Sequence, residues 1–143
     1  MIPGYKISSA NEDMDISVIH GYLSRSYWSK DIPLATVQTA MAHSLCFGVF
    51  TEAGQQVAFA RLITDQATFA YLADVFVLEG HQGKGISKWL IQTILDDSRL
   101  QGLRRIILAT RDAHSLYEQF GFKTLASPEK FMALHQPNIY KSV

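Results

Sequence analysis

The feature that most constrains the fold is a nine-residue apolar run, Phe69 to Val77, with the sequence FAYLADVFV. Its only charged residue is Asp74. A run of this kind is typical of a strand that is buried on both faces in the middle of a sheet. A glycine turn follows, then apolar residues at helical spacing from Ile86, then the strand-like run Arg104 to Thr110. Strand, turn, helix and strand in this order predict a crossover unit with two parallel strands.

The rest of the chain predicts further elements around this unit. Asp13 to Tyr22 has helical periodicity, and Asp13 or Asp15 can cap that helix. The other predicted helices are Leu34 to His43, Ile86 to a stop at Gly102, and Ala113 to Phe120. The other predicted strands are Tyr5 to Ser8, Leu45 to Thr51, Gln56 to Thr64, Phe122 to Ala126 and Lys130 to His135, with a hairpin turn at Glu52 to Gln55. We therefore predict one α/β domain over residues 1–143, with a twisted, mixed sheet of about six or seven strands and helices on both faces.

Charge and cysteine content exclude several classes of function. Lys+Arg and Asp+Glu number 13 each, so the basic excess of a nucleic-acid binder is missing. Cys46 is the single cysteine and the five histidines have no zinc-pair spacing, so we predict no disulfide and no metal. The start of the chain lacks a secretory signal and no apolar stretch could span a membrane. We predict a cytoplasmic protein without nucleic-acid or membrane partners, and leave open whether it forms a homodimer.

The glycine turn Gln82-Gly83-Lys84-Gly85, which leads into a helix at Ile86, carries the strongest chemical signal. Two glycines spaced by one residue let the backbone approach a ligand, and the helix start offers unpaired N–H groups and a positive dipole end. This combination predicts a phosphate or pyrophosphate site. The alternative is a plain strand-to-helix connection. A dinucleotide fingerprint fails because Lys88 stands where its third glycine belongs, and a P-loop fails because Ile86 is neither Ser nor Thr.

Two segments together resemble a known family. They are LADVFVLEGHQGKGISKWL, residues 72–90, and ATRDAHSLYEQFGF, residues 109–122. Their combination is similar to the GNAT superfamily of acyl-CoA-dependent N-acyltransferases. The resemblance implies acetyl-CoA as co-substrate, with the pantetheine arm paired to backbone and the pyrophosphate wrapped by the turn. The implied cofactor contacts are Phe76, Val77, Gln82, Gly83, Lys84, Gly85, Ile86, Ser87 and His114. The chain departs from the family pattern at Gln82, where arginine is usual, and at Ser87, where glycine is frequent.

Acyl transfer to an amine requires a neutral amine, a donor for the oxyanion and a stabilised leaving thiolate. By resemblance, Tyr117 lies near the thioester sulfur and donates a hydrogen bond to the departing thiolate; the alternative is an aromatic side chain that only packs its helix. Asp74 is either the base that takes the ammonium proton or a buried acid satisfied by backbone or a tyrosine hydroxyl. Cys46 fits a small core residue better than a nucleophile.

The resemblance also implies that the acceptor contacts the loop between the first two helices. Tyr27 and Trp28 lie in that loop and either frame an amine or staple the helix end to the core. The predicted function is acetyl-CoA-dependent N-acetylation of a primary amine, in a small molecule or peptide, by direct attack on the thioester. The alternative is a CoA-binding sensing module without efficient turnover.

Overall fold

The computed structural model describes residues 1–141 of the chain. Contacts along the chain divide it into two compact units, Met1–Ala109 and Thr110–Val143.

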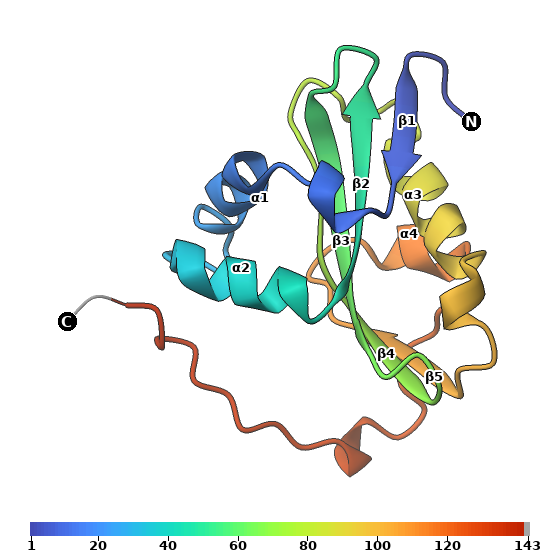
Figure 1. Ribbon diagram of the computed structural model, residues 1–143. Coiled ribbons are helices and arrows are strands. Elements are labelled where there is room, and N and C mark those ends of the chain that lie inside the picture. Colours follow the sequence, from blue (N-terminus) through green and yellow to red (C-terminus); the bar gives the residue numbers. More distant parts are fainter. Residues whose placement is uncertain (142–143) are drawn as a thin grey trace. The chain divides into compact units, whose positions relative to one another are not determined.

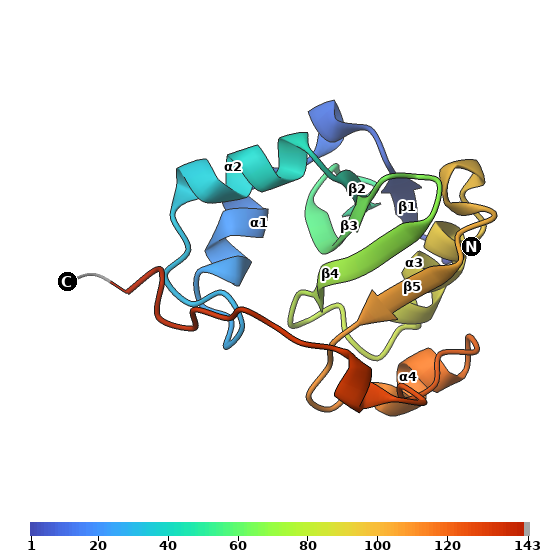
Figure 2. The same ribbon diagram turned by 90° about the horizontal axis from the view of Figure 1, so that it is seen from below.

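The first unit is built on a five-stranded mixed sheet whose strands follow the order β1-β2-β3-β4-β5. The strands are β1 (Tyr5–Ser8), β2 (Leu45–Thr51), β3 (Gln56–Thr64), β4 (Phe69–Val77) and β5 (Arg105–Leu108). Neighbours from β1 to β4 are antiparallel, and β5 is parallel to β4. Figure 2 shows β4 and β5 side by side. The predicted crossover unit is therefore confirmed, although the sheet has fewer strands than expected.

Helices of the first unit cover both faces of this sheet. They are α1 (Ile16–Leu23), α2 (Leu34–Ala42) and α3 (Ile86–Leu95), with short 3₁₀ helices at Asn11–Asp13 and Ser98–Leu100. Helices α1 and α2 lie on one side of the sheet and α3 on the other (Figure 1). The cap of α1 is Asp15, whose side chain accepts the N–H groups of Ser17 and Val18. Helix α3 ends at Leu95, before the predicted stop at Gly102, because a separate 3₁₀ turn capped by Asp97 intervenes.

The second unit contains helix α4 (His114–Glu118) and a 3₁₀ helix at Pro128–Lys130. The predicted strands at 122–126 and 130–135 are wrong, since neither segment is assigned as a strand within the described residues. A strand needs a neighbouring strand to pair its N–H and C=O groups, and residues 110–141 supply none. Met132 and Leu134, which lie in the second of these segments, are almost fully exposed.

A buried glutamine connects α1 to the sheet of the first unit. Gln56 is completely buried, and its Oε1 accepts the N–H of Asp15 at 2.7 Å. Its Nε2 donates to the carbonyl of Ala58 at 3.1 Å. Gly48 on β2 leaves room for this side chain, because a Cβ at Gly48 would lie 2.8 Å from that Nε2 and 3.0 Å from Sδ of Met14.

We expect Gly48→Ala to lower the free energy of unfolding by about 2–4 kcal/mol, from overpacking and from the loss of a hydrogen bond of Gln56. Thermal and urea unfolding measure the change. The matched control is Gly21→Ala in α1, where the new Cβ would meet only Nη1 of Arg25 at 3.5 Å. This control should be stabilising by roughly 0.5–1 kcal/mol, as expected for glycine in a helix. Equal stability of both variants would contradict the tight fit at Gly48.

Candidate active site

One edge of β4 loses its strand partner halfway along. Parallel pairing with β5 covers Phe69 to Leu72, which face Arg105 to Leu108, and goes no further. On the opposite edge, β3 pairs with β4 as far as Val77. Within residues 1–141, no strand pairs with β4 from residue 73 to 77 on its β5 side, although the carbonyl of Val77 already accepts the side-chain amide of Gln82. An extended ligand with amide groups can pair there as a further strand would.

Asp74 lies at an irregularity in this stretch of β4. The register between β3 and β4 shifts between Phe59 and Arg61, where one residue of β3 faces two of β4. Asp74 has φ of 58°, the left-handed region that few residues other than glycine adopt. Aspartate and asparagine tolerate this region better than other side chains. The bulge turns the Asp74 side chain to the α1 and α2 side of the sheet, where its partners lie.

The glycine turn directly follows the unpaired edge. Gly80, Gly83 and Gly85 all have left-handed φ, of 93°, 78° and 83°. A Cβ added at Gly80 or Gly83 would meet nothing within 4 Å, and one at Gly85 would meet only Ile2 at 3.9 Å. The space in front of the turn is therefore open and its backbone is accessible. The predicted role of this turn, binding a pyrophosphate, stays a prediction.

The charges around the start of α3 also suit an anion. Its N-cap is Gly85, which has no side chain to accept the first N–H groups of the helix. Helices favour acidic residues in the first turn, because the dipole is positive there, yet the first turn of α3 has none. Lys84 and Lys88 lie at this end instead, both exposed. Positive side chains at a positive helix end are explained if a negative ligand binds between them.

Side-chain hydrogen bonds fasten this turn to the rest of the first unit. Nε2 of Gln82 donates to the carbonyl of Val77 at 3.0 Å, so this amide holds the turn against the end of β4. The hydroxyl of Tyr5 lies 2.8 Å from Nδ1 of His81, and the two rings meet edge to face. Tyr5 and His81 were not among the sequence-predicted site residues. The turn is thereby held between β1 and β4.

Aromatic side chains gather where α1 packs on β4. Tyr22 of α1 stacks flat on Phe76, with ring centroids 4.0 Å apart and planes 9° apart. Trp28 lies 6.2 Å from Tyr22 and meets Tyr27 edge to face at 5.1 Å. Tyr27 and Trp28 are 57% and 40% exposed, and Trp28 contacts both Tyr22 of α1 and Asp74 of β4. Both predicted roles, framing an amine and stapling the helix end, stay predictions.

Asp74 is the centre of a hydrogen-bonded chain. Its Oδ1 accepts the indole N–H of Trp28 at 2.9 Å, and its Oδ2 accepts Nε of Arg61 at 2.9 Å. Arg61 in turn donates from Nη1 to Oγ of Ser44 at 3.1 Å. The partners of Asp74 are therefore Arg61 and Trp28, rather than the backbone or tyrosine hydroxyl considered from the sequence. Arg61 was missed, although the sequence holds a signal for it: Arg61 and Asp74 are the single charged residues of two adjoining strands.

The remaining predicted site residues lie in the second unit. Tyr117 of α4 is 7% exposed, and its ring meets Phe122 edge to face at 5.8 Å. His114 begins α4 and is exposed. Their roles toward the thioester and the CoA arm stay predictions.

Cys46 is a core residue of β2. It is buried, and burial raises the pKa of its thiol to about 11. The thiol is therefore protonated near neutral pH and is a poor nucleophile. No group of three His, Cys, Asp or Glu side chains within residues 1–141 could hold a metal ion. In that range, too, no helix combines the length and apolar character of a membrane span.

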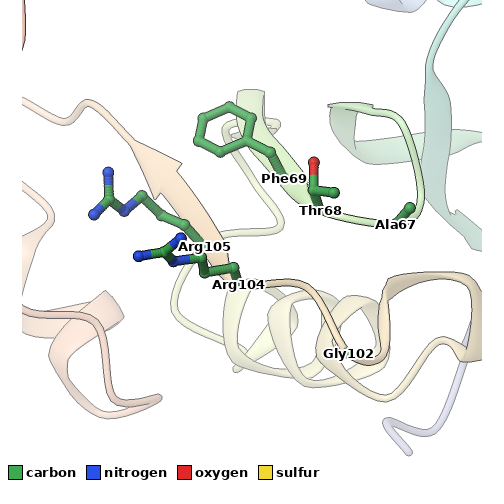
Figure 3. A pocket seen from close by; sticks show the side chains of 6 residues that line it. All are labelled: Ala67, Thr68, Phe69, Gly102, Arg104 and Arg105. Carbon is green, nitrogen blue, oxygen red and sulfur yellow. The ribbon is translucent and has the colours of Figure 1, made fainter.

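A separate open depression lies at the beginning of β4 and β5 (Figure 3). It has a volume of about 680 Å³ and is lined by Ala67, Thr68, Phe69, Gly102, Arg104 and Arg105. Phe69 begins β4 whereas the glycine turn follows its end, so the two places are about 26 Å apart along an extended strand. This depression is therefore distinct from the glycine turn.

Comparisons with known proteins agree with this geometry. The profile of the acetyltransferase (GNAT) family matches residues 16–122. A solved structure of a GNAT-family protein from Xanthomonas campestris pv. campestris is 50% identical, with a TM-score of 0.95 over 99% of this chain and 100% of that one. A protein from Gibberella zeae, whose name proposes an acetyltransferase, is 33% identical over 79% of this chain and 75% of its own.

More distant structures share the fold alone. Glucosamine-6-phosphate N-acetyltransferase from Arabidopsis thaliana is 18% identical, with a TM-score of 0.62 over 85% of this chain and 93% of that one. The family profile covers most of the chain, including β4, the glycine turn and α4. The chain therefore belongs to the acetyltransferase (GNAT) family.

Proposed function

We propose that the protein is an acetyl-CoA-dependent N-acetyltransferase that moves an acetyl group to a primary amine of a small molecule or peptide. The observation that carries this proposal is the unpaired edge of β4 running into a left-handed glycine turn at the start of α3. Such an edge suits the amides of pantetheine, and such a turn suits a pyrophosphate. Family membership supports the same cofactor.

The proposed cofactor contacts are mostly backbone. Phe76 and Val77 would pair with the pantetheine arm, and the N–H groups between Gly83 and Ser87 would bind the pyrophosphate. Lys84 would add a mobile charge. Gln82 would act indirectly, since its amide is bonded to the Val77 carbonyl, and His114 is proposed beside the CoA arm. Because these proposed contacts come from backbone N–H groups, they do not require the arginine that is usual at the position of Gln82.

We propose direct attack of the amine on the thioester. The nitrogen lone pair forms a bond to the acetyl carbon, the carbonyl is regenerated as the C–S bond breaks, and CoA leaves as the thiolate. Tyr117 would donate a hydrogen bond to the sulfur and give it a proton as it leaves. The attacking nitrogen would release one proton as the amide forms, and this proton, passed through water, would restore the neutral tyrosine. A covalent route through Cys46 is disfavoured because its buried thiol, with pKa raised to about 11, stays protonated.

Asp74 is proposed to receive the proton of the acceptor's ammonium, directly or through water. Its carboxylate lies 2.9 Å from Nε of Arg61 and 2.9 Å from Nε1 of Trp28, on the stretch of β4 that β5 does not cover. We expect Asp74→Asn to lower kcat/KM roughly 10²-fold at pH 7, with recovery as pH rises, because more amine then arrives neutral. Asparagine tolerates the left-handed φ of this position, so the backbone is kept.

The pH–rate profiles of both proteins measure this effect. A variant that melts earlier but keeps the shape of the wild-type profile would show that Asp74 is a structural acid and not the base.

Calorimetry with acetyl-CoA and an assay of free thiol release over a panel of amines test the proposed function. We expect binding and amine-dependent thiol release. Binding without release for any amine would favour the alternative, a CoA-binding sensing module. The lack of a charged side chain at Gln82 is the observation that favours this alternative. No binding at millimolar acetyl-CoA would reject both.

A further inference from the structure

The ion pair of Arg61 and Asp74 has donors and lone pairs that the protein does not use. Arg61 donates from Nε to Asp74 and from Nη1 to Ser44, and within residues 1–141 its Nη2 donates to nothing. No fully enclosed side-chain nitrogen or oxygen of these residues lacks a partner, so Nη2 is reached by solvent. Each oxygen of Asp74 accepts one hydrogen bond, whereas a carboxylate offers about four acceptor sites.

The Arg61–Asp74 pair is largely buried, so its interactions with a ligand would be strong. The side chains of Arg61 and Asp74 are 15% and 10% exposed, so interactions with their open groups are less screened than on the surface. Asp74 lies on the stretch of β4 that β5 does not cover. Trp28, 40% exposed, is next to it, since its indole N–H is bonded to Asp74, and the ring of Tyr27 meets Trp28 edge to face.

We propose that the acceptor is a free α-amino acid, bound as a zwitterion. Its ammonium meets Asp74, its carboxylate takes the open Nη2 of Arg61, and its side chain lies against Tyr27 and Trp28. A single carbon holds the two charges of an α-amino acid side by side, and the opposite charges of the pair are also adjacent, with Nε and Oδ2 2.9 Å apart. An amine without a carboxylate would leave Nη2 of Arg61 without an acceptor on the ligand.

The aromatic neighbours favour an apolar side chain on this amino acid. Trp28 is bonded to Asp74 and contacts Tyr22 and Tyr27, so ring surface lies near the ion pair, and ring surface binds aliphatic and aromatic groups by contact. Phenylalanine, leucine and methionine are therefore the first acceptors to examine. This inference rests on the proposed acetyl-transfer function and narrows its acceptor.

Matched sets of acceptors test the inference. Each set consists of the L-amino acid, its amide and the amine without the carboxyl group, for example phenylalanine, phenylalaninamide and 2-phenylethylamine. Thiol release from acetyl-CoA gives kcat/KM for each. We expect the amino acid to exceed both partners about 10- to 100-fold, since a hydrogen bond to a charged group contributes that much. The amide is a stringent control, because at pH 7 a larger fraction of its amine is neutral, and so able to attack, than in the amino acid.

The variant Arg61→Gln should remove this preference. The readout is the ratio of kcat/KM for phenylalanine to that for 2-phenylethylamine, which does not depend on how much of the variant is folded. We expect the ratio to fall about tenfold or more, with Arg61→Lys recovering part of it through its charge. The control Arg104→Gln, at the other end of β4 and β5, should leave the ratio unchanged.

Two results would overturn the inference while leaving the proposed function intact. One is that simple amines are acetylated as well as the matched amino acids. The other is that Arg61→Gln keeps the wild-type ratio. If acetyl-CoA does not bind and no acceptor releases thiol, the proposed function itself fails, and the inference fails with it.

Discussion

Replacing Gly85 with valine should abolish acetyl-CoA binding and leave a folded protein. Gly85 has φ of 83° and is the N-cap of α3. A β-branched side chain is strongly disfavoured at this φ, so the turn must change shape, and the side chain would also occupy the path of the pyrophosphate. Hydrogen bonds to charged groups contribute about 1.5–3 kcal/mol each, so losing two weakens binding by about 10²- to 10⁴-fold. Calorimetry measures this loss.

The matched control for this variant is Gly54→Val. Gly54 has φ of 91°, and no atom lies within 4 Å of the place for its Cβ. It belongs to the hairpin turn between β2 and β3, so its substitution imposes similar backbone strain away from the glycine turn. Both variants should lose similar stability, on the order of 1–2 kcal/mol, but only Gly85→Val should lose binding. Equal affinity in both would show that the turn does not hold the cofactor.

We expect Tyr117→Phe to reduce kcat by about 10²–10⁴-fold, the range for one general acid. The substitution keeps the ring and its edge-to-face contact with Phe122 and removes only the hydroxyl. Affinity for acetyl-CoA should stay within about threefold, because the hydroxyl is proposed to act on the thiolate as it leaves. Single-turnover measurements of thiol release isolate this step.

The control for the loss of a phenolic hydroxyl is Tyr71→Phe. Tyr71 lies in the half of β4 that pairs with β5, away from the glycine turn, and its replacement should not change kcat. If Tyr117→Phe turns over as fast as wild type, Tyr117 only packs its helix. If Tyr117→Phe and Tyr71→Phe lower kcat equally, the loss does not come from a role of the Tyr117 hydroxyl in the reaction.

The sequence predicts the elements that carry a strong local pattern. The glycine turn and the periodic helix α3 follow as expected, because left-handed glycines and helical spacing each leave a clear pattern. The apolar run also forms strand β4, but β4 is not buried on both faces, since Phe69 is exposed and residues 73–75 are half-buried. The predicted strands at 122–126 and 130–135 are absent because no neighbouring strand pairs with these segments within residues 1–141. Apolar side chains alone cannot supply a partner for the backbone.

The sequence located the glycine turn of the candidate site, because two spaced glycines before a helix are a recognisable motif. It did not reveal the side-chain contacts of Asp74. Trp28 is 46 residues from Asp74 in sequence, and the pairing with Arg61 depends on a register shift between β3 and β4. Such a shift is set by the packing of the whole sheet, so the sequence offers only the coarser signal that Arg61 and Asp74 are the single charged residues of two adjoining strands.

The left-handed backbone at Asp74 limits how this position can change during evolution or design. Glutamate would keep the negative charge, but at φ of 58° an ordinary side chain costs on the order of 1–2 kcal/mol, and its longer chain displaces the carboxylate from Arg61 and Trp28. Asparagine and glycine would accept the backbone, but neither brings a charge. No single substitution therefore keeps both the geometry and the charge. Aspartate is the only residue that satisfies both, which makes this one of the least exchangeable positions of the chain.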